Sequence, residues 1–263
     1  MMIIHRVSLQ VSSDVQRSLA SAGLGVEQGF VSFEIDESDA RWPAVSQLVD
    51  RVGAVDIVST QFSNQEIATA TALQMAPSWH WGYPQPKEDF GYLELTYDLA
   101  NYCPTCGVGL RQKAPFRLSG EPRWGSRHLL QLNWVFDEFF IRPEKWEEVF
   151  QPLGIGHRPV LNAATGRELT SVVQLTVSYE LAADVPATSR AACVACGRVK
   201  YEPHTRGRLP YINLKGVHAA KTEQYFGSGT SAWKAIVVSA ELCERVRRAS
   251  LKGVEFVPVE ERD

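Results

Sequence analysis

Two short cysteine motifs constrain the middle of this 263-residue chain: Cys103-Pro104-Thr105-Cys106-Gly107 and Cys193-Val194-Ala195-Cys196-Gly197. In each motif two residues separate the sulfurs, so both thiolates can point at one centre. The glycine that follows the second cysteine frees the backbone to turn back toward that centre. Two such knuckles supply four thiolates, the ligand set of a closed, tetrahedral structural zinc site. Because an all-thiolate site leaves no open position for a substrate, the motifs predict a structural metal.

The long segment 107–192 separates the two knuckles, far more than in a compact zinc ribbon. Closing a long loop costs only about 0.6 kcal/mol per doubling of its length, which favours convergence of Cys103, Cys106, Cys193 and Cys196 on one zinc ion. Two alternatives remain. Each pair could recruit other ligands, His204 being the nearest candidate, or each CxxC could serve disulfide or redox chemistry. If the thiolates converge, metal-binding free energy becomes folding free energy.

Composition bounds the class of protein. Apolar residues make up 44% of the chain, charged residues 22%, and the net charge is −3, which is ordinary for a globular protein and argues against a nucleic-acid module. No apolar run reaches the roughly 20 residues of a membrane span, and the N-terminus lacks a signal-peptide pattern. Four of the five cysteines lie in tight pairs, which fits a reducing compartment. We therefore expect a cytoplasmic protein without a membrane partner.

Residues 1–75 alternate between strand and helix patterns. Period-two alternation predicts strands at 6–11, 30–35 and 55–58. Ser12 or Ser13 can cap a first helix that ends near Gly23, and Asp39 can cap a second that ends at Gly53. The pattern predicts a βαβαβ-like module, able to form a small sheet covered by helices.

The remainder, residues 76–263, reads as a region of mixed sheet. We expect an aromatic loop at 79–86, a helix that begins at Pro143, and strands at 92–97, 129–140 and 172–177. The C-terminal segment predicts a βαβ phrase. Its strands lie at 235–238 and 254–257, and its helix is capped by Ser239 and terminated by Gly253.

These elements place the chain in the α+β class, with an N-terminal βαβαβ-like module, a split four-cysteine zinc-knuckle site and a C-terminal βαβ phrase. The division is 1–75 and 76–263, or one continuous body with a seam near 76–90.

A search for catalytic patterns gives no assembled site. Cys243 lies in the last predicted helix without a nearby His, which favours a packed structural thiol over a nucleophile. The stretch 227–231 (GSGTS) lacks the Lys-Ser/Thr and preceding strand of a phosphate loop, so we expect a turn. Asp137-Glu138 and Glu147-Glu148 are adjacent carboxylates that point in different directions, and solvated faces explain them best. We expect no catalytic residues and no enzyme.

Aromatic residues gather in one loop and suggest a partner-binding surface. Trp79, His80, Trp81 and Tyr83 form the cluster, and Trp124 is a second candidate. Large aromatic side chains at a rigid surface are typical anchors of protein interfaces. The competing interpretation is an aromatic loop packed on the core.

The two knuckles and the tail together resemble the double-CxxCG family of bacterial immunity proteins associated with polymorphic toxins. The resemblance covers 103–107, the knuckle 193–198 (CVACGR), 236–242 (IVVSAEL) and 252–259 (KGVEFVPV). It implies a cytoplasmic protein that binds a cognate toxin domain and blocks it by steric occlusion or stoichiometric capture, without turnover.

Two other functions remain open from the residues alone. A zinc-ribbon nucleic-acid-binding or regulatory module would show salt-sensitive binding to DNA or RNA. An enzyme with zinc as scaffold, using His80 or the acidic pairs, would show a pocket lined by titratable groups with shifted pKa values.

Overall fold

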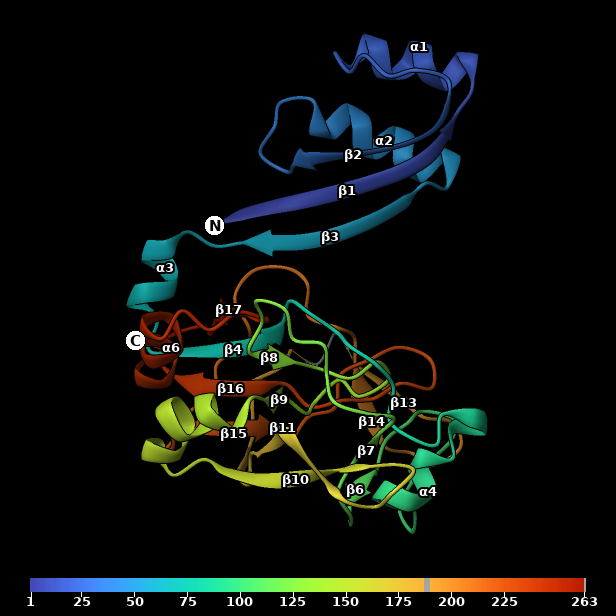
Figure 1. The fold of residues 1–263 in the computed structure, drawn as a ribbon. Helices are drawn as coiled ribbons and strands as arrows, with labels where there is room; N and C mark the ends of the chain where they lie inside the picture. The colour runs from blue at the N-terminus through green and yellow to red at the C-terminus, as the bar shows by residue number, and fades with distance from the viewer. Residues whose placement is uncertain (187–189, 263) are drawn as a thin grey trace. The chain divides into compact units, whose positions relative to one another are not determined.

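The computed structural model describes residues 1–186 and 190–262, which form two compact units. The first unit comprises Met1–Glu66 and Thr205–Gly207, and the second unit comprises the other described residues. Figure 1 shows the elements of both. The predicted α+β class is confirmed, because helices accompany several separate sheets in which parallel and antiparallel strands occur.

The first unit is a three-stranded sheet with the strand order β2-β1-β3. The central strand β1 pairs antiparallel with both neighbours. The predicted alternation of strands and helices is confirmed, with these bounds: β1 Met2–Val11, α1 Ser13–Ser21, β2 Gly29–Asp36, α2 Trp42–Val52 and β3 Val55–Gln61.

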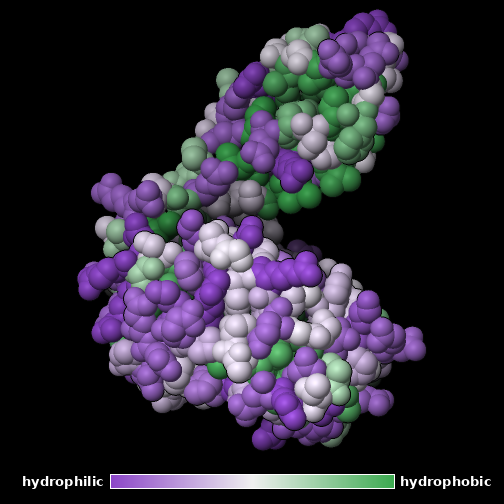
Figure 2. Space-filling model, viewed as in Figure 1, coloured by the Kyte–Doolittle hydropathy of each residue, from purple (hydrophilic) through white to green (hydrophobic). Residues whose placement is uncertain are grey.

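Alternation along β1 explains how this unit buries a core. Val7, Leu9 and Val11 on one face are almost fully buried and pack with Leu19 of α1 and Leu48 of α2. Apolar residues remain exposed elsewhere on the sheet, and Figure 2 shows hydrophobic surface on this unit. The unit therefore has a core of its own.

The caps of its helices follow the sequence in one case and depart from it in the other. Ser12 caps α1, since its hydroxyl accepts from the Val15 N–H at 3.4 Å. Asp39 does not cap α2, which begins at Trp42 after Arg41. The Asp39 carboxylate instead accepts from the Arg41 N–H at 2.9 Å, so it shapes the turn before the helix.

A short return of the chain completes the first unit. Arg206 Nη2 donates to Glu37 Oε2 at 2.7 Å. Thr60 Oγ1 donates to the Thr205 carbonyl at 3.0 Å and accepts from the Gly207 N–H at 2.8 Å. The chain therefore contributes to this unit twice.

The second unit contains two five-stranded sheets. The first has the order β12-β15-β16-β4-β17, with bounds β4 Ala72–Pro77, β12 Glu180–Leu181, β15 Ala219–Thr222, β16 Ile236–Ser239 and β17 Val254–Pro258. The second has the order β7-β10-β11-β9-β8, with bounds β7 Arg117–Leu118, β8 Leu129–Leu130, β9 Phe140–Ile141, β10 Gly156–Asn162 and β11 Glu168–Thr176. The residues 67–75, which the sequence pattern grouped with the opening module, lie in this second unit.

The predicted C-terminal βαβ phrase frames strand β4. Strands β16 and β17 both pair antiparallel with β4, on opposite sides, and helix α6 (Ala240–Arg248) connects them. Ser239 caps α6 as predicted, accepting from the Leu242 N–H at 3.2 Å. Gly253 does not end the helix, which stops at Arg248. Gly253 instead has φ +107°, and a Cβ at this position would lie 1.9 Å from the Leu129 carbonyl oxygen.

Two predicted strands are wrong. The range 92–97 forms helix α4 (Tyr92–Thr96) followed by the two-residue strand β5 (Tyr97–Asp98), because Tyr92 and Thr96 bury at helical spacing. The run 129–140 folds back on itself: β8 and β9 pair with each other, and the loop between them contains Trp134 with φ +70°. A continuous apolar run does not reveal such a reversal.

Other predicted elements are confirmed. Pro143 occupies the first turn of a short helical segment made of α5 (Pro143–Lys145), a π-turn (Trp146–Phe150) and a 3-10 turn (Gln151–Leu153). Strand β11 covers the predicted 172–177 except Val177. The sequence did not predict helix α3 (Asn64–Thr69) or the 3-10 turn Glu88–Phe90, which are the other helical elements of the described residues. In the described residues no helix is both long and apolar enough to cross a membrane.

Candidate metal centre

Each cysteine knuckle sits at the end of a two-stranded ribbon in the second unit. Strands β5 and β6 (Arg111–Gln112) flank the first knuckle and pair antiparallel. Strands β13 (Arg190–Ala192) and β14 (Val199–Tyr201) flank the second in the same way. Each ribbon holds the two ends of its knuckle loop together, which restricts where the cysteines of that loop can lie.

The two knuckles have the same backbone geometry. In the first, the Gly107 N–H donates to the Cys103 carbonyl at 2.8 Å and the Cys103 N–H donates to the Val108 carbonyl at 3.0 Å. In the second, the Gly197 N–H donates to the Cys193 carbonyl at 2.8 Å and the Cys193 N–H donates to the Arg198 carbonyl at 2.9 Å. Both glycines have positive φ, +80° and +72°, which the turn requires.

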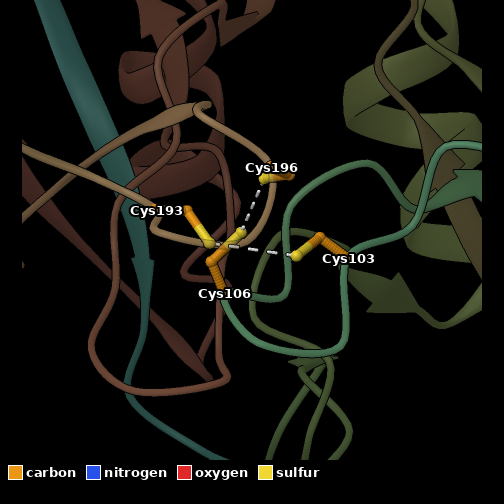
Figure 3. Close-up of side chains that lie close together, drawn as sticks. All are labelled: Cys103, Cys106, Cys193 and Cys196. Atoms are coloured by element: carbon orange, nitrogen blue, oxygen red, sulfur yellow. Dashed lines mark hydrogen bonds between the residues drawn. The ribbon is translucent and has the colours of Figure 1, made fainter.

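The four sulfurs converge on one point, as Figure 3 shows. All four lie within 4.8 Å of one another. The sulfurs of Cys103 and Cys193 are 3.9 Å apart, and those of Cys106 and Cys196 are 3.7 Å apart. A tetrahedral metal with sulfur ligands at about 2.3 Å has sulfur–sulfur edges of about 3.8 Å. The four cysteines are therefore positioned to bind a metal ion.

Burial and pKa differ among the four thiols. Cys103 and Cys106 are buried, Cys193 is half-buried and Cys196 is exposed. Hydrogen bonds from the Arg198 backbone N–H and guanidinium lower the pKa of Cys196 to about 6, whereas burial raises the pKa of Cys106 to about 11. A metal ion must therefore displace protons at neutral pH, and its binding weakens as pH falls.

Two basic side chains bind the knuckles together. Lys200 Nζ donates to the Cys106 carbonyl at 2.9 Å and also to the carbonyls of Gly229 and Ser231. Arg198 Nη1 donates to the Asn101 carbonyl at 2.6 Å. Ribbon β13–β14 is thereby attached to the first knuckle without help from a metal. The stretch 227–231 forms the turn expected from its sequence.

The alternative ligand is not at the site. His204 is exposed, and within the described part of the chain the metal-ligating cluster consists of the four cysteines alone. Cys243 lies in the core of the second unit at 3% exposure, and burial raises its pKa to about 11. Its predicted structural role is confirmed.

The aromatic residues predicted to bind a partner occupy different environments. Trp79 and Trp81 are half-buried and pack against a core cluster, and His80 is exposed. Trp124 is buried and its indole N–H donates to the Ser171 carbonyl at 3.0 Å, which leaves little of it for a partner. Tyr83 is exposed, and its ring centroid lies 4.5 Å from that of Trp134.

A larger aromatic surface surrounds Trp134, which sequence reasoning missed. The ring centroids of Phe90 and Trp134 are 4.7 Å apart. Phe136, two residues after Trp134, is also exposed. Phe90, Trp134 and Phe136 line a groove of about 360 Å³ that also contains Pro104 and Gly107 of the first knuckle. We call this the aromatic groove. The turn at Trp134, hidden in a run that resembled a strand, brings these residues together.

The acidic pairs divide between surface and interior. Glu147 and Glu148 are exposed as predicted, and Glu148 pairs with Lys145 at 2.6 Å. Glu138 is not on a solvated face: it is buried, and its carboxylate accepts from Lys221 at 2.5 Å and from Gln174 at 2.9 Å. Lys221 is far away in the sequence, so nothing near Glu138 indicated this pair.

Comparison of the chain with protein-family models, characterised proteins and solved structures gave no match.

Proposed function

We propose that this chain is a zinc-stabilised binding protein of the immunity type, which captures a cognate bacterial toxin domain without turnover. The observation that carries the proposal is the closed cluster of four thiolates, contributed by two knuckles far apart in the sequence. Such a ligand set offers a metal no open position, so its role is to hold the fold. The order of the two knuckles and the tail phrase supports the immunity assignment through the resemblance described above.

Zinc is the metal that fits this donor set best. Thiolate sulfur is a soft ligand, and four of them in a tetrahedron are typical of zinc or of iron–sulfur centres. Metal analysis of protein purified under reducing conditions tests the assignment, with one zinc per chain expected. Protein that carries iron and absorbs visible light would contradict it.

The aromatic groove is the surface that we assign to the toxin. Interface anchors are enriched in Trp and Tyr, and exposed aromatic side chains grouped together mark binding surfaces. Phe90, Trp134 and Phe136 in the groove, and Tyr83 beside Trp134, are each more than a third exposed. Because Pro104 and Gly107 form part of the groove, the metal-bound knuckle supports one of its walls.

Co-expression with the products of neighbouring genes tests the proposal. A toxin domain should co-purify with the chain at a fixed ratio, and cells that express both should survive. Trp134→Ala should weaken capture at least tenfold, because it removes the ring that Tyr83 and Phe90 contact. Tyr179→Ala is the matched control, since Tyr179 is 58% exposed and lies outside the groove.

Two outcomes would contradict the proposal. If no neighbouring product is toxic, or if the chain protects against none of them, the immunity function is wrong. If capture is unaffected by Trp134→Ala, the function stands but the toxin binds elsewhere. Toxin capture that requires catalytic turnover, seen as protection at far less than one chain per toxin, would also overturn it.

A further inference from the structure

The second unit also contains a polar cavity that is distinct from the aromatic groove, although Gly107 borders both. Its volume is about 710 Å³, within the range of small-molecule sites. Five basic and three acidic side chains line it, together with Tyr97, Gln112 and Gln174. The lining is therefore polar and carries a net positive charge.

The inner part of the cavity is a hydrogen-bonded network. Lys221 donates to Glu138, and Gln174 Nε2 donates to the other oxygen of the same carboxylate. Gln174 and Gln112 exchange hydrogen bonds at 2.7 and 2.8 Å through their side-chain amides. Gln174 and Glu138 are 2% and 8% exposed. A buried network of this kind holds its polar atoms in fixed positions.

Burial of these charges needs an explanation. Replacing a buried ion pair by apolar residues is often neutral or stabilising, so a buried pair is weak evidence for a stabilising role. Burial raises the pKa of Glu138, although Lys221 opposes the effect. Perturbed carboxyl groups beside a cavity are commonest at binding sites.

Three arginines line the cavity, and Arg198 is already bonded to the Cys196 sulfur and the Asn101 carbonyl. Arg111, on β6, and Arg158, on β10, form no ion pair with any of the described residues, whereas Lys221 and Lys234 are paired with Glu138 and Glu180. A guanidinium has a planar fork of donors that matches a carboxylate or phosphate group. Tyr97 adds a phenol that burial keeps protonated, because its pKa is raised well above the usual range.

We propose that this cavity binds a small polar anion with a carboxylate or phosphate group, which Arg111 and Arg158 hold while the Glu138–Lys221–Gln174 network receives its remaining polar atoms. The ion pairs already inside the cavity neutralise one another, so the free arginines supply the attraction. The proposal does not depend on the toxin-binding function and is tested without a partner protein.

The experiment uses zinc-loaded, full-length protein and calorimetric titration with two probes, inorganic phosphate and succinate. Chloride is adjusted to hold ionic strength constant, because exposed arginines bind any anion weakly. We expect saturable binding of one equivalent of at least one probe. Phosphate alone would identify a phosphorylated ligand, and succinate alone a carboxylate.

The variant Arg158→Gln should weaken binding at least tenfold, and Arg111→Gln should act in the same direction. Arg167→Gln is the matched control, because Arg167 is exposed on the β10–β11 hairpin and outside the cavity lining. Tyr97→Phe provides a second, conservative test that removes only a hydroxyl. Zinc content and circular dichroism verify that each variant is folded. The proposal is overturned if neither probe binds more tightly than chloride, or if Arg158→Gln and Tyr97→Phe both bind like the parent chain.

Discussion

At Gly107 the backbone passes so close to the loop 227–232 that a methyl group does not fit. A Cβ built there would lie 2.2 Å from the Thr230 carbonyl oxygen and 2.9 Å from the Ala232 nitrogen. Gly197 occupies the same position of the second knuckle, with a similar φ, but a Cβ there would meet nothing within 4 Å. Both glycines therefore need a left-handed backbone, but only Gly107 also needs the absence of a side chain.

This difference predicts unequal effects of the same substitution. Gly197→Ala should lower the free energy of unfolding by about 1 kcal/mol, the cost of a left-handed conformation for alanine. Gly107→Ala should cost on the order of 3 kcal/mol or more, because backbone atoms must also move. Urea denaturation of zinc-loaded variants measures both. Equal losses would show that the contact at Thr230 is unimportant.

The knuckle thiols can be tested by single substitutions. Cys103→Ser should abolish stoichiometric zinc binding and lower the free energy of unfolding by on the order of 3 kcal/mol or more, since metal binding is coupled to folding. Cys243→Ala is the control: it should retain zinc and cost only about 1 to 2 kcal/mol for a small cavity. Metal analysis and denaturation give the two readouts. Full zinc occupancy in Cys103→Ser would rule out a four-cysteine site.

The buried pair of Glu138 and Lys221 allows a double-mutant cycle. Glu138→Gln leaves Lys221 without its closest counter-charge in the interior, so we expect a loss of about 3 kcal/mol. Lys221→Met in the same chain removes the ammonium, which would otherwise keep only the more distant Asp137 carboxylate at 3.8 Å, and should recover much of that loss. Chemical denaturation at pH 7 measures the cycle. Additive losses would mean that the two side chains are not coupled.

Strand β11 shows how side chains can replace a sheet partner. Its pairing with β10 shifts register between Pro159 and Leu161, so several β11 residues face a single position of β10. The Glu121 carboxylate accepts from the backbone N–H groups of Thr170 and Ser171 at 2.8 and 3.1 Å. Backbone donors left over by the bulge are thereby satisfied.

This arrangement predicts a pH-dependent contribution from Glu121. Partial burial raises the pKa of its carboxyl, but the hydrogen bonds from Ser171 and Thr170 outweigh that effect and leave the pKa below the ordinary value. A lowered pKa stabilises the fold above the unfolded-state pKa, near 4.5, and the contribution disappears as pH falls through the folded-state value. Glu121→Gln should therefore be less stable than the parent at pH 7, with the gap narrowing below about pH 4. A gap independent of pH would contradict the assignment.

Sequence patterns predicted some of these elements and not others. The terminal βαβ phrase was predictable because β16 ends at Ser239, which caps α6, and apolar residues at helical spacing follow. Helix α4 was not, because Tyr92, Leu93 and Leu95 fit a strand as well as a helix. The cysteine cluster was predictable from ligand chemistry alone, whereas the cavity depends on Glu138 meeting Lys221 across a long stretch of chain.

For the molecule as a whole, metal removal should affect the two units differently. The cysteines all lie in the second unit, and the first has a separate core around Val7, Leu9 and Leu48. Chelation of zinc should lower the unfolding temperature of the second unit and leave that of the first unchanged. Peptide-resolved hydrogen exchange, measured with and without the chelator, reports the loss of amide protection in each unit separately. Equal loss of protection in β1 and β16 would show that the units unfold together.

The return of residues 205–207 to the first unit has a consequence for how that unit can be inherited. A gene fragment that encodes only residues 1–66 omits Arg206, the partner of Glu37, and the backbone groups that bond Thr60. Recombination that transplanted such a fragment into another gene would deliver an incomplete surface. The core of the unit lies within residues 1–66, so such a fragment would keep its core and lose only these surface contacts.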